Sequence, residues 1–115
     1  MRKLTNALIE YVSDIDDVMK RFVDDEDFYI ECLVLFFEDD NLEKLKIAID
    51  NRDLNEAFNA AHTIKGISGN LGLTPIFNLA SELVEDFRLK KMENALKKYD
   101  FINSEYKKVK KIAQI

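Results

Sequence analysis

The stretch DLNEAFNAAHTIKGISGNLGL, residues 53–73, decides most of what can be predicted about the fold of this chain. Asp53 suits a helix N-cap, and Glu56 follows three residues later, at the acidic position of a capping box. Apolar residues then recur at helical spacing. Gly72 stands where a left-handed residue often ends a helix. The stretch therefore predicts one helix over residues 54–71.

Helical periodicity continues on both sides of this stretch. Thr74 and Pro75 predict the start of the next helix, with threonine as its N-cap and proline at N1. The run Asp39-Asp40-Asn41 is expected to bend the long helix that precedes Asp53. The further helices predicted in this way cover residues 4–12, 15–23, 28–51, 75–90 and 93–113.

The links between the long helices are only two to five residues, which favours antiparallel neighbours. We therefore predict an all-α fold: an antiparallel up-down-up-down four-helix bundle with a short N-terminal helical cap. Three glycines and one proline in 115 residues leave little of the turn chemistry that a β fold needs. No linker rich in glycine, serine or proline divides the chain, so residues 1–115 are expected to form a single domain.

Charge and cysteine content restrict the partners and the compartment. Residues 1–56 contain 16 acidic and 7 basic side chains (net −9), whereas residues 57–115 contain 6 acidic and 10 basic side chains (net +4). The acidic half argues against nucleic acid as a partner.

Cys32, the single cysteine, cannot form an internal disulfide, which favours a reducing, cytoplasmic location. No apolar run is long enough for membrane insertion. The start at Met1 and the lack of a linker favour a free-standing protein, expected as a monomer.

One face of the helix over residues 54–71 carries the residues that could do chemistry. The opposite face is an apolar stripe that should face the bundle core, with Ser68 as its polar exception. The stripe consists of Leu54, Ala57, Phe58, Ala61, Ile64 and Leu71. The outer face carries Asn55, Asn59, His62, Lys65, Gly66 and Gly69. His62, the only histidine of the chain, is therefore predicted to point into solvent.

Gly66 and Gly69 need an explanation, because a glycine inside a helix costs about 0.5–1 kcal/mol relative to alanine. One explanation is access, since a bare backbone lets another protein approach the imidazole of His62. The other is close packing between two helices. Lys65, three residues after His62, would favour an anionic group on the imidazole and a neutral, nucleophilic ring before attachment. The pattern indicates a phosphoryl carrier; a plain surface histidine on a structural bundle is the alternative.

The segment AHTIKGISGNLGL, residues 61–73, resembles the signature H-x-[LI]-K-G-x-[SG]-x-x-[LF]-G of the histidine-containing phosphotransfer (HPt) family. The similarity is strongest over about residues 28–90. It implies that His62 accepts a phosphoryl group, on the imidazole nitrogen farther from the backbone, from a receiver-domain aspartate and passes it to another receiver. Lys65 would be the phosphate-side cation, and Gly66 would give access. The chain would be a phosphocarrier and not an enzyme, without a cofactor of its own, because the receiver supplies the metal and most catalytic groups.

The resemblance also indicates where a partner would dock. Arg88 matches the family's second hairpin helix by position and is expected near the docking surface. Asn59 and Ile67, close to the histidine, are further candidates for partner contacts. Ile67 and Phe22 are the candidates for an apolar docking patch. Some family members place a glutamine near the histidine to orient the phosphoryl group, and this chain has Val84 there.

Other classes of protein fit the sequence less well. A complete sensor kinase is excluded by length, but an HPt-like domain of a hybrid or chemotaxis sensor kinase is an alternative, as is a non-phosphorylated helical adaptor. A hybrid sensor kinase is also a candidate partner. One histidine and one cysteine are too few for a soft-ligand metal site, so none is expected. No serine, cysteine or carboxylate pairs with His62 at a spacing that indicates a hydrolase.

Overall fold

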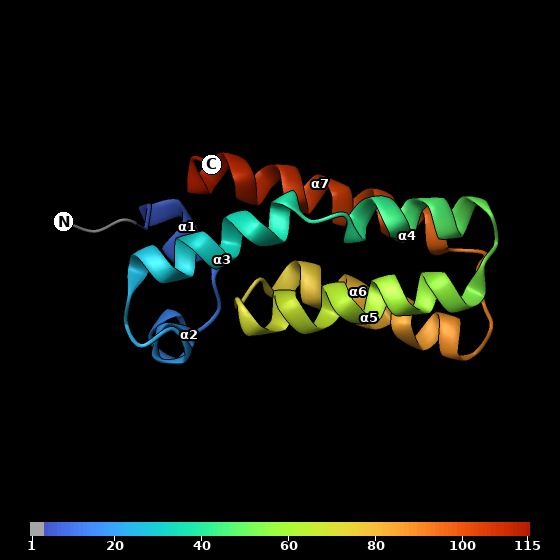
Figure 1. Cartoon of the computed structure of the whole chain (residues 1–115), viewed down its shortest axis with the longest axis horizontal. Coiled ribbons are helices and arrows are strands. Elements are labelled where there is room, and N and C mark those ends of the chain that lie inside the picture. The colour runs from blue at the N-terminus through green and yellow to red at the C-terminus, as the bar shows by residue number, and fades with distance from the viewer. Residues whose placement is uncertain (1–3) are drawn as a thin grey trace.

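A computed structural model describes residues 4–115, and every regular element within this part of the chain is a helix. Figure 1 shows how the helices are arranged. Their bounds are α1 Asn6–Tyr11, α2 Ile15–Arg21, α3 Glu26–Glu38, α4 Asn41–Asp50, α5 Leu54–Asn70, α6 Thr74–Arg88 and α7 Ala95–Ala113. The predicted all-α class is confirmed. The helix predicted over residues 54–71 corresponds to α5.

The expected bend at Asp39-Asp40-Asn41 is a complete break, so the prediction of one helix over residues 28–51 is wrong. Asp39 has an extended backbone, with φ −71° and ψ 169°. Its carboxylate accepts a hydrogen bond from the Asn41 backbone N–H at 3.0 Å. Aspartate side chains compete in this way with helical hydrogen bonds. As a result, α3 ends at Glu38 and α4 begins at Asn41.

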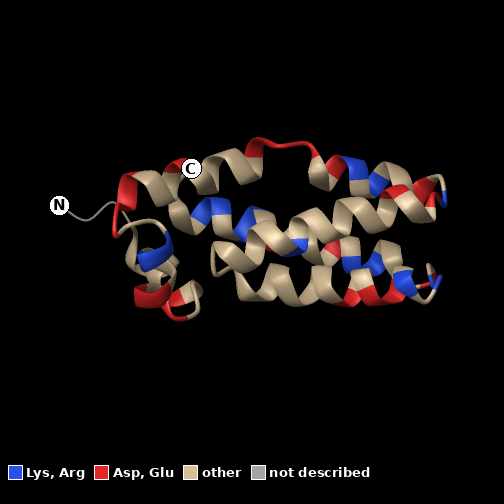
Figure 2. Cartoon of the chain, turned by 60° about the horizontal axis from the view of Figure 1, so that its bottom comes forward, with Lys and Arg blue, Asp and Glu red and all other residues tan. Residues whose placement is uncertain are grey.

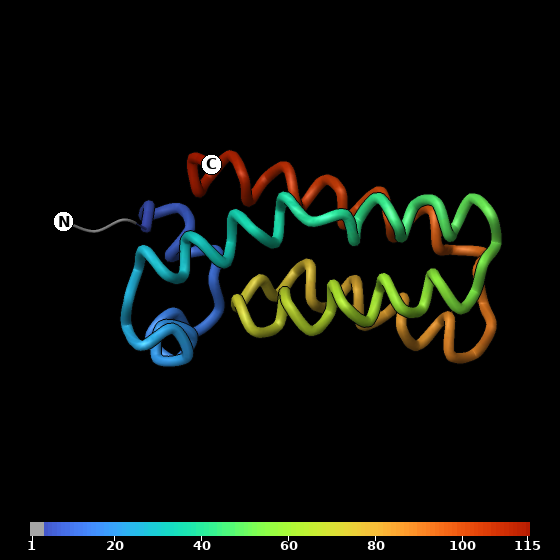
Figure 3. Tube along the Cα trace, viewed as in Figure 1, coloured from blue at the N-terminus to red at the C-terminus, as the bar shows by residue number. Residues whose placement is uncertain are grey.

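Four of the helices pack around a shared core. α4 packs against α5, α5 against α6 and α6 against α7, which returns to contact α4. The trace in Figure 3 shows α5, α6 and α7 each running back along the helix before it. Lys98 of α7 lies 2.6 Å from the Asp86 carboxylate of α6, and this hydrogen bond raises the pKa of Lys98. All four helices contribute fully buried side chains, among them Leu45, Ile64, Ile76, Leu83 and Ile102.

The two helix starts predicted from capping residues had different outcomes. Asp53 caps α5, because its carboxylate accepts the Glu56 N–H at 3.2 Å. In a capping box the Asp53 N–H would donate to the Glu56 side chain. Here it donates to the Ala48 carbonyl instead. The predicted N-cap of α6 is wrong: Thr74 is the first helical residue. Its hydroxyl donates to the Ser13 hydroxyl oxygen at 2.7 Å, so a tertiary contact uses the side chain expected at the helix end.

The N-terminal helices cover the end of the bundle at which α5 turns into α6 (Figure 1). Gly72 lies in this turn with φ +75°, as predicted for a left-handed residue. Its carbonyl accepts a hydrogen bond from the Ser13 N–H at 3.2 Å. A Cβ at Gly72 would lie 2.7 Å from Cγ1 of Val12 and 2.8 Å from Cγ2 of Val18. The N-terminal helices therefore pack directly on the turn that follows α5.

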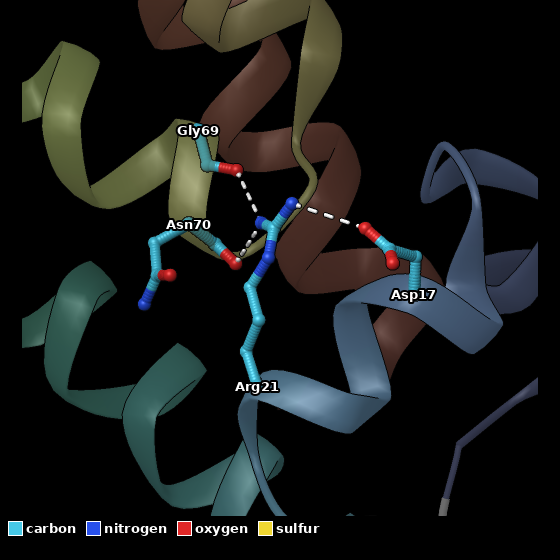
Figure 4. Close-up of polar contacts among 4 residues, drawn as sticks. All are labelled: Asp17, Arg21, Gly69 and Asn70. Carbon is cyan, nitrogen blue, oxygen red and sulfur yellow. Dashed lines mark hydrogen bonds and ion pairs between the residues drawn. The ribbon is translucent and has the colours of Figure 1, made fainter.

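Arg21 of α2 binds the end of α5 as well (Figure 4). One guanidinium nitrogen donates to the carbonyl oxygens of Gly69 at 3.2 Å and of Asn70 at 3.0 Å. Another lies 3.5 Å from the Asp17 carboxylate. The last carbonyls of a helix have no intrahelical donor and carry the negative end of its dipole. Arg21 thus stabilises the end of α5 and fastens α2 to it.

Replacing Arg21 with methionine is expected to lower the free energy of unfolding by about 1 kcal/mol, the usual contribution of such hydrogen bonds at a partly exposed helix end. Urea unfolding followed by circular dichroism measures the difference. Lys20→Met, an exposed neighbour on the same helix, is the matched control and should stay within about 0.5 kcal/mol of the wild type. Equal effects of the two substitutions would contradict the role of Arg21.

Candidate functional site

His62 lies in the middle of α5 and is exposed, as the helical periodicity predicted. The core side of the same helix buries Ala57, Ala61, Ile64 and Ser68. The Ser68 hydroxyl donates to the Lys65 carbonyl at 3.2 Å, so the one polar group on the apolar stripe is satisfied by the backbone. The packing of α5 into the bundle therefore holds His62 on the outer surface.

The imidazole of His62 stacks on the ring of Phe58, one turn earlier on α5. The two ring centroids are 5.8 Å apart, and the planes meet at 22°. The guanidinium carbon of Arg88, at the end of α6, lies 5.9 Å from the centroid of the Phe58 ring. Arg88 also pairs with the Glu85 carboxylate at 3.2 Å. Phe58 was predicted only as part of the apolar stripe, although its position four residues before His62 also indicates a contact between the two rings.

Lys65 lies nearly one turn after His62 and is half-buried. It is the only lysine or arginine of α5, whose other ionised side chain is Glu56 in the first turn. Figure 2 shows that acidic residues gather on the N-terminal helices and in the link between α3 and α4, whereas basic residues recur along α7. Within α5, the Lys65 ammonium lies about one turn from the His62 imidazole, whereas the Glu56 carboxylate lies nearly two turns away.

The structure gives the two glycines of α5 different explanations. A Cβ added at Gly66 would have nothing within 4 Å, and the residue is exposed. A Cβ added at Gly69 would lie 2.9 Å from Cδ2 and 3.1 Å from Cε2 of the Phe77 ring on α6. Access is therefore the wrong explanation for Gly69, where close helix packing requires glycine. Only at Gly66 is the backbone beside His62 open.

The residues predicted to contact a partner lie in different environments. Asn59 and Arg88 are exposed, and Ile67 is partly buried against the core. The prediction that Phe22 is a docking residue is wrong, because only 4% of its surface is exposed and its ring packs edge-on against Tyr29. Val84, at the position where some HPt proteins have glutamine, is fully buried. Its side chain packs in the core.

A protein-family model described as the Hpt domain matches residues 33–112, more than half of the chain. This chain belongs to the HPt family. The match contains α4 to α6 and all but the last residue of α7, with His62 and its neighbours, and it leaves out α1 and α2. HPt domains are phosphocarriers of two-component signalling and interact with receiver domains in phosphorelays. Neither the search of curated proteins nor the search of solved structures found a match.

Two further observations concern the surroundings of the HPt site. Among residues 4–115, no three histidine, cysteine, aspartate or glutamate side chains are grouped so that they could hold a metal ion. In the same part of the chain, no helix is both long enough and apolar enough to cross a membrane.

The open space at Gly66 leads to a prediction about stability. Gly66→Ala is expected to raise the free energy of unfolding of this HPt domain by about 0.5–1 kcal/mol, because alanine is the better helix former and its methyl group meets no neighbour. Gly69→Ala is the matched comparison on the same helix and should be destabilising, since it must displace Phe77. Urea unfolding of both variants measures the contrast. Destabilisation by Gly66→Ala would show that its backbone is not free.

Proposed function

We propose that this HPt domain carries a phosphoryl group on His62, which it accepts from the aspartate of one receiver domain and passes to another. The observation that carries the proposal is the placement of the chain's only histidine, exposed in mid-α5 with Lys65 one turn away and open backbone at Gly66. An adaptor would need none of these features together. The family match supports the same reading.

The proposed transfer needs a neutral imidazole. The lone pair on Nε2 of His62 forms the bond to phosphorus, while the bond between phosphorus and the aspartate oxygen breaks. The electron pair of that bond returns to the aspartate carboxylate, and the imidazole proton stays on Nδ1. The reverse step passes the phosphoryl group on. Phosphoryl transfer depends mainly on positioning and charge neutralisation, which the receiver and its magnesium ion would supply.

The neighbours of His62 would assist in separate ways. The Lys65 ammonium would stabilise the charge of the attached phosphoryl group. Gly66 would let the receiver backbone come close to the imidazole. Asn59 and Ile67 are proposed contacts of the receiver. The encounter would be small and transient, as signalling contacts often are.

We propose the finer architecture and setting on the same basis. Helices α4 to α7 would form the up-down-up-down bundle, with α1 and α2 as its N-terminal cap and α3 extending α4 toward that cap. The chain would act as one domain, as a monomer and in the cytoplasm, where receiver domains are available. It would supply no cofactor and act as a carrier whose catalytic groups come mostly from the partner.

Phosphoryl transfer from a panel of acetyl-phosphate-loaded receiver domains tests the proposal. Wild-type protein is expected to take up a label that acid removes and base does not, as a phosphorus–nitrogen bond requires. Adding a second, unloaded receiver should then draw the label away. If no receiver labels a chain whose helical content is intact, the hypothesis of a non-phosphorylated adaptor replaces that of a phosphoryl carrier.

A further inference from the structure

The contact between Phe58 and His62 joins a ring that packs against the core to an imidazole that is exposed to solvent. Phe58 is partly buried and packs against the core cluster, so the bundle restrains its ring. His62 is exposed, and its stacking partner is this ring at 5.8 Å. An exposed histidine on a helix would otherwise move among its staggered rotamers within nanoseconds. Stacking on a restrained ring selects the rotamer that lies over Phe58.

Arg88 reaches the same ring from the neighbouring helix. Its guanidinium carbon lies 5.9 Å from the Phe58 centroid, within the range at which a cation is attracted to an aromatic face. Glu85 holds the guanidinium from the preceding turn of α6, at 3.2 Å. Phe58 is thus restrained by the core beneath it and by a cation from α6. This contact joins the end of α6 to the imidazole through one ring.

We infer that Phe58 is a positioning residue that holds the His62 imidazole in the orientation from which it reacts, and that Arg88 acts through Phe58. The inference rests on the proposed function and deepens it. A helical side chain has two common χ1 wells and one rare well. Releasing the imidazole from Phe58 would leave about one half to one third of the molecules in the reactive rotamer. The limiting rate of transfer should fall by the same factor, about two- to threefold.

This role is separable from a docking role for the same residues. A positioning residue changes the fraction of reactive molecules inside the complex, so it lowers the limiting rate and leaves the half-saturating receiver concentration unchanged. A residue that binds the receiver raises the half-saturating concentration. Arg88, predicted from the sequence to lie at the docking surface, is thereby given a different function that kinetics can distinguish.

Nuclear magnetic resonance tests the contact without any phosphoryl transfer, because the single histidine gives unambiguous imidazole signals. Phe58→Leu keeps an apolar side chain against the core but removes the aromatic ring. The His62 Hδ2 and Hε1 signals are expected to move downfield, and the three-bond couplings that report χ1 should become averaged. Phe58→Tyr should retain the wild-type signals. Phe101→Leu, at a phenylalanine of α7 that is 50% exposed, is the matched control and should leave them unchanged.

Single-turnover transfer from a loaded receiver, over a range of receiver concentrations, tests the function. Phe58→Leu is expected to lower the limiting rate two- to threefold with an unchanged half-saturating concentration, and Phe58→Tyr to restore it. Arg88→Gln should lower the limiting rate less, and in the Phe58→Leu background it should have no further effect. Arg88→Lys, which keeps a cation, should resemble the wild type. An Arg88→Gln effect on half-saturation that persists in the Phe58→Leu background would overturn the inference for Arg88.

The two proposals fail in different ways. Unchanged imidazole signals and unchanged limiting rate in Phe58→Leu would overturn the positioning role while leaving phosphoryl transfer intact. A wild type that no receiver labels would overturn the proposed function, and with it the role in transfer, even if the imidazole signals move in Phe58→Leu.

Discussion

Replacing His62 with glutamine is expected to abolish phosphoryl acceptance completely. The amide nitrogen of glutamine has no available lone pair, so it cannot form the bond to phosphorus that a neutral imidazole forms. Because His62 is exposed and its side chain is not part of the core, the free energy of unfolding should change by no more than about 0.5 kcal/mol. The measurement is label transferred from a loaded receiver to each variant, with urea unfolding as the check on the fold.

Asn55→Gln is the matched control for this substitution, because Asn55 is exposed on the same helix and about two turns before His62. It should accept the label at the wild-type rate. Since the chain has no second histidine, an acid-labile, base-stable label cannot move to another imidazole in the His62→Gln variant. Label of that kind on the variant would show that His62 is not the acceptor.

The second large effect is expected from Gly72→Ala, which should lower the free energy of unfolding by about 2–5 kcal/mol. An alanine at φ +75° is strained by about 1–2 kcal/mol. Its Cβ would also stand 2.7 Å from Val12 Cγ1 and 2.8 Å from Val18 Cγ2, and such overpacking typically adds about 1–3 kcal/mol. Small domains have a total stability of about 5–15 kcal/mol, so the loss is a large fraction.

Urea unfolding at fixed pH measures this loss, and Gly66→Ala is the control that separates it from a general effect of replacing glycine. The two variants are expected to shift the midpoint in opposite directions. Hydrogen exchange adds a local readout, because the Ser13 amide donates to the Gly72 carbonyl and should lose protection first. A Gly72→Ala protein as stable as the wild type would mean that α1 and α2 do not press on the turn in solution.

The features that could be predicted from the sequence depend on residues close together in the chain. Asp53 caps α5 because its carboxylate meets an amide three residues later, and the exposure of His62 follows from the apolar stripe on the other side of its helix. The left-handed conformation at Gly72 was also readable, since few other residues adopt it at low cost. The break at Asp39 was only foreseen as a bend, because the competing side-chain hydrogen bond depends on one rotamer.

The sequence by itself determined the helical class, the helix that carries His62 and the side of that helix on which the imidazole lies. Tertiary structure decided the rest. Phe77 fills the space at Gly69, and Arg88 lies over the Phe58 ring from α6. Phe28 and Tyr29 of α3 pack against Phe22, which is buried. The Ser13 hydroxyl accepts a hydrogen bond from the Thr74 hydroxyl. Periodicity shows which side of a helix is apolar, but not which distant side chain will meet it, because that depends on how helices far apart in the chain are packed together.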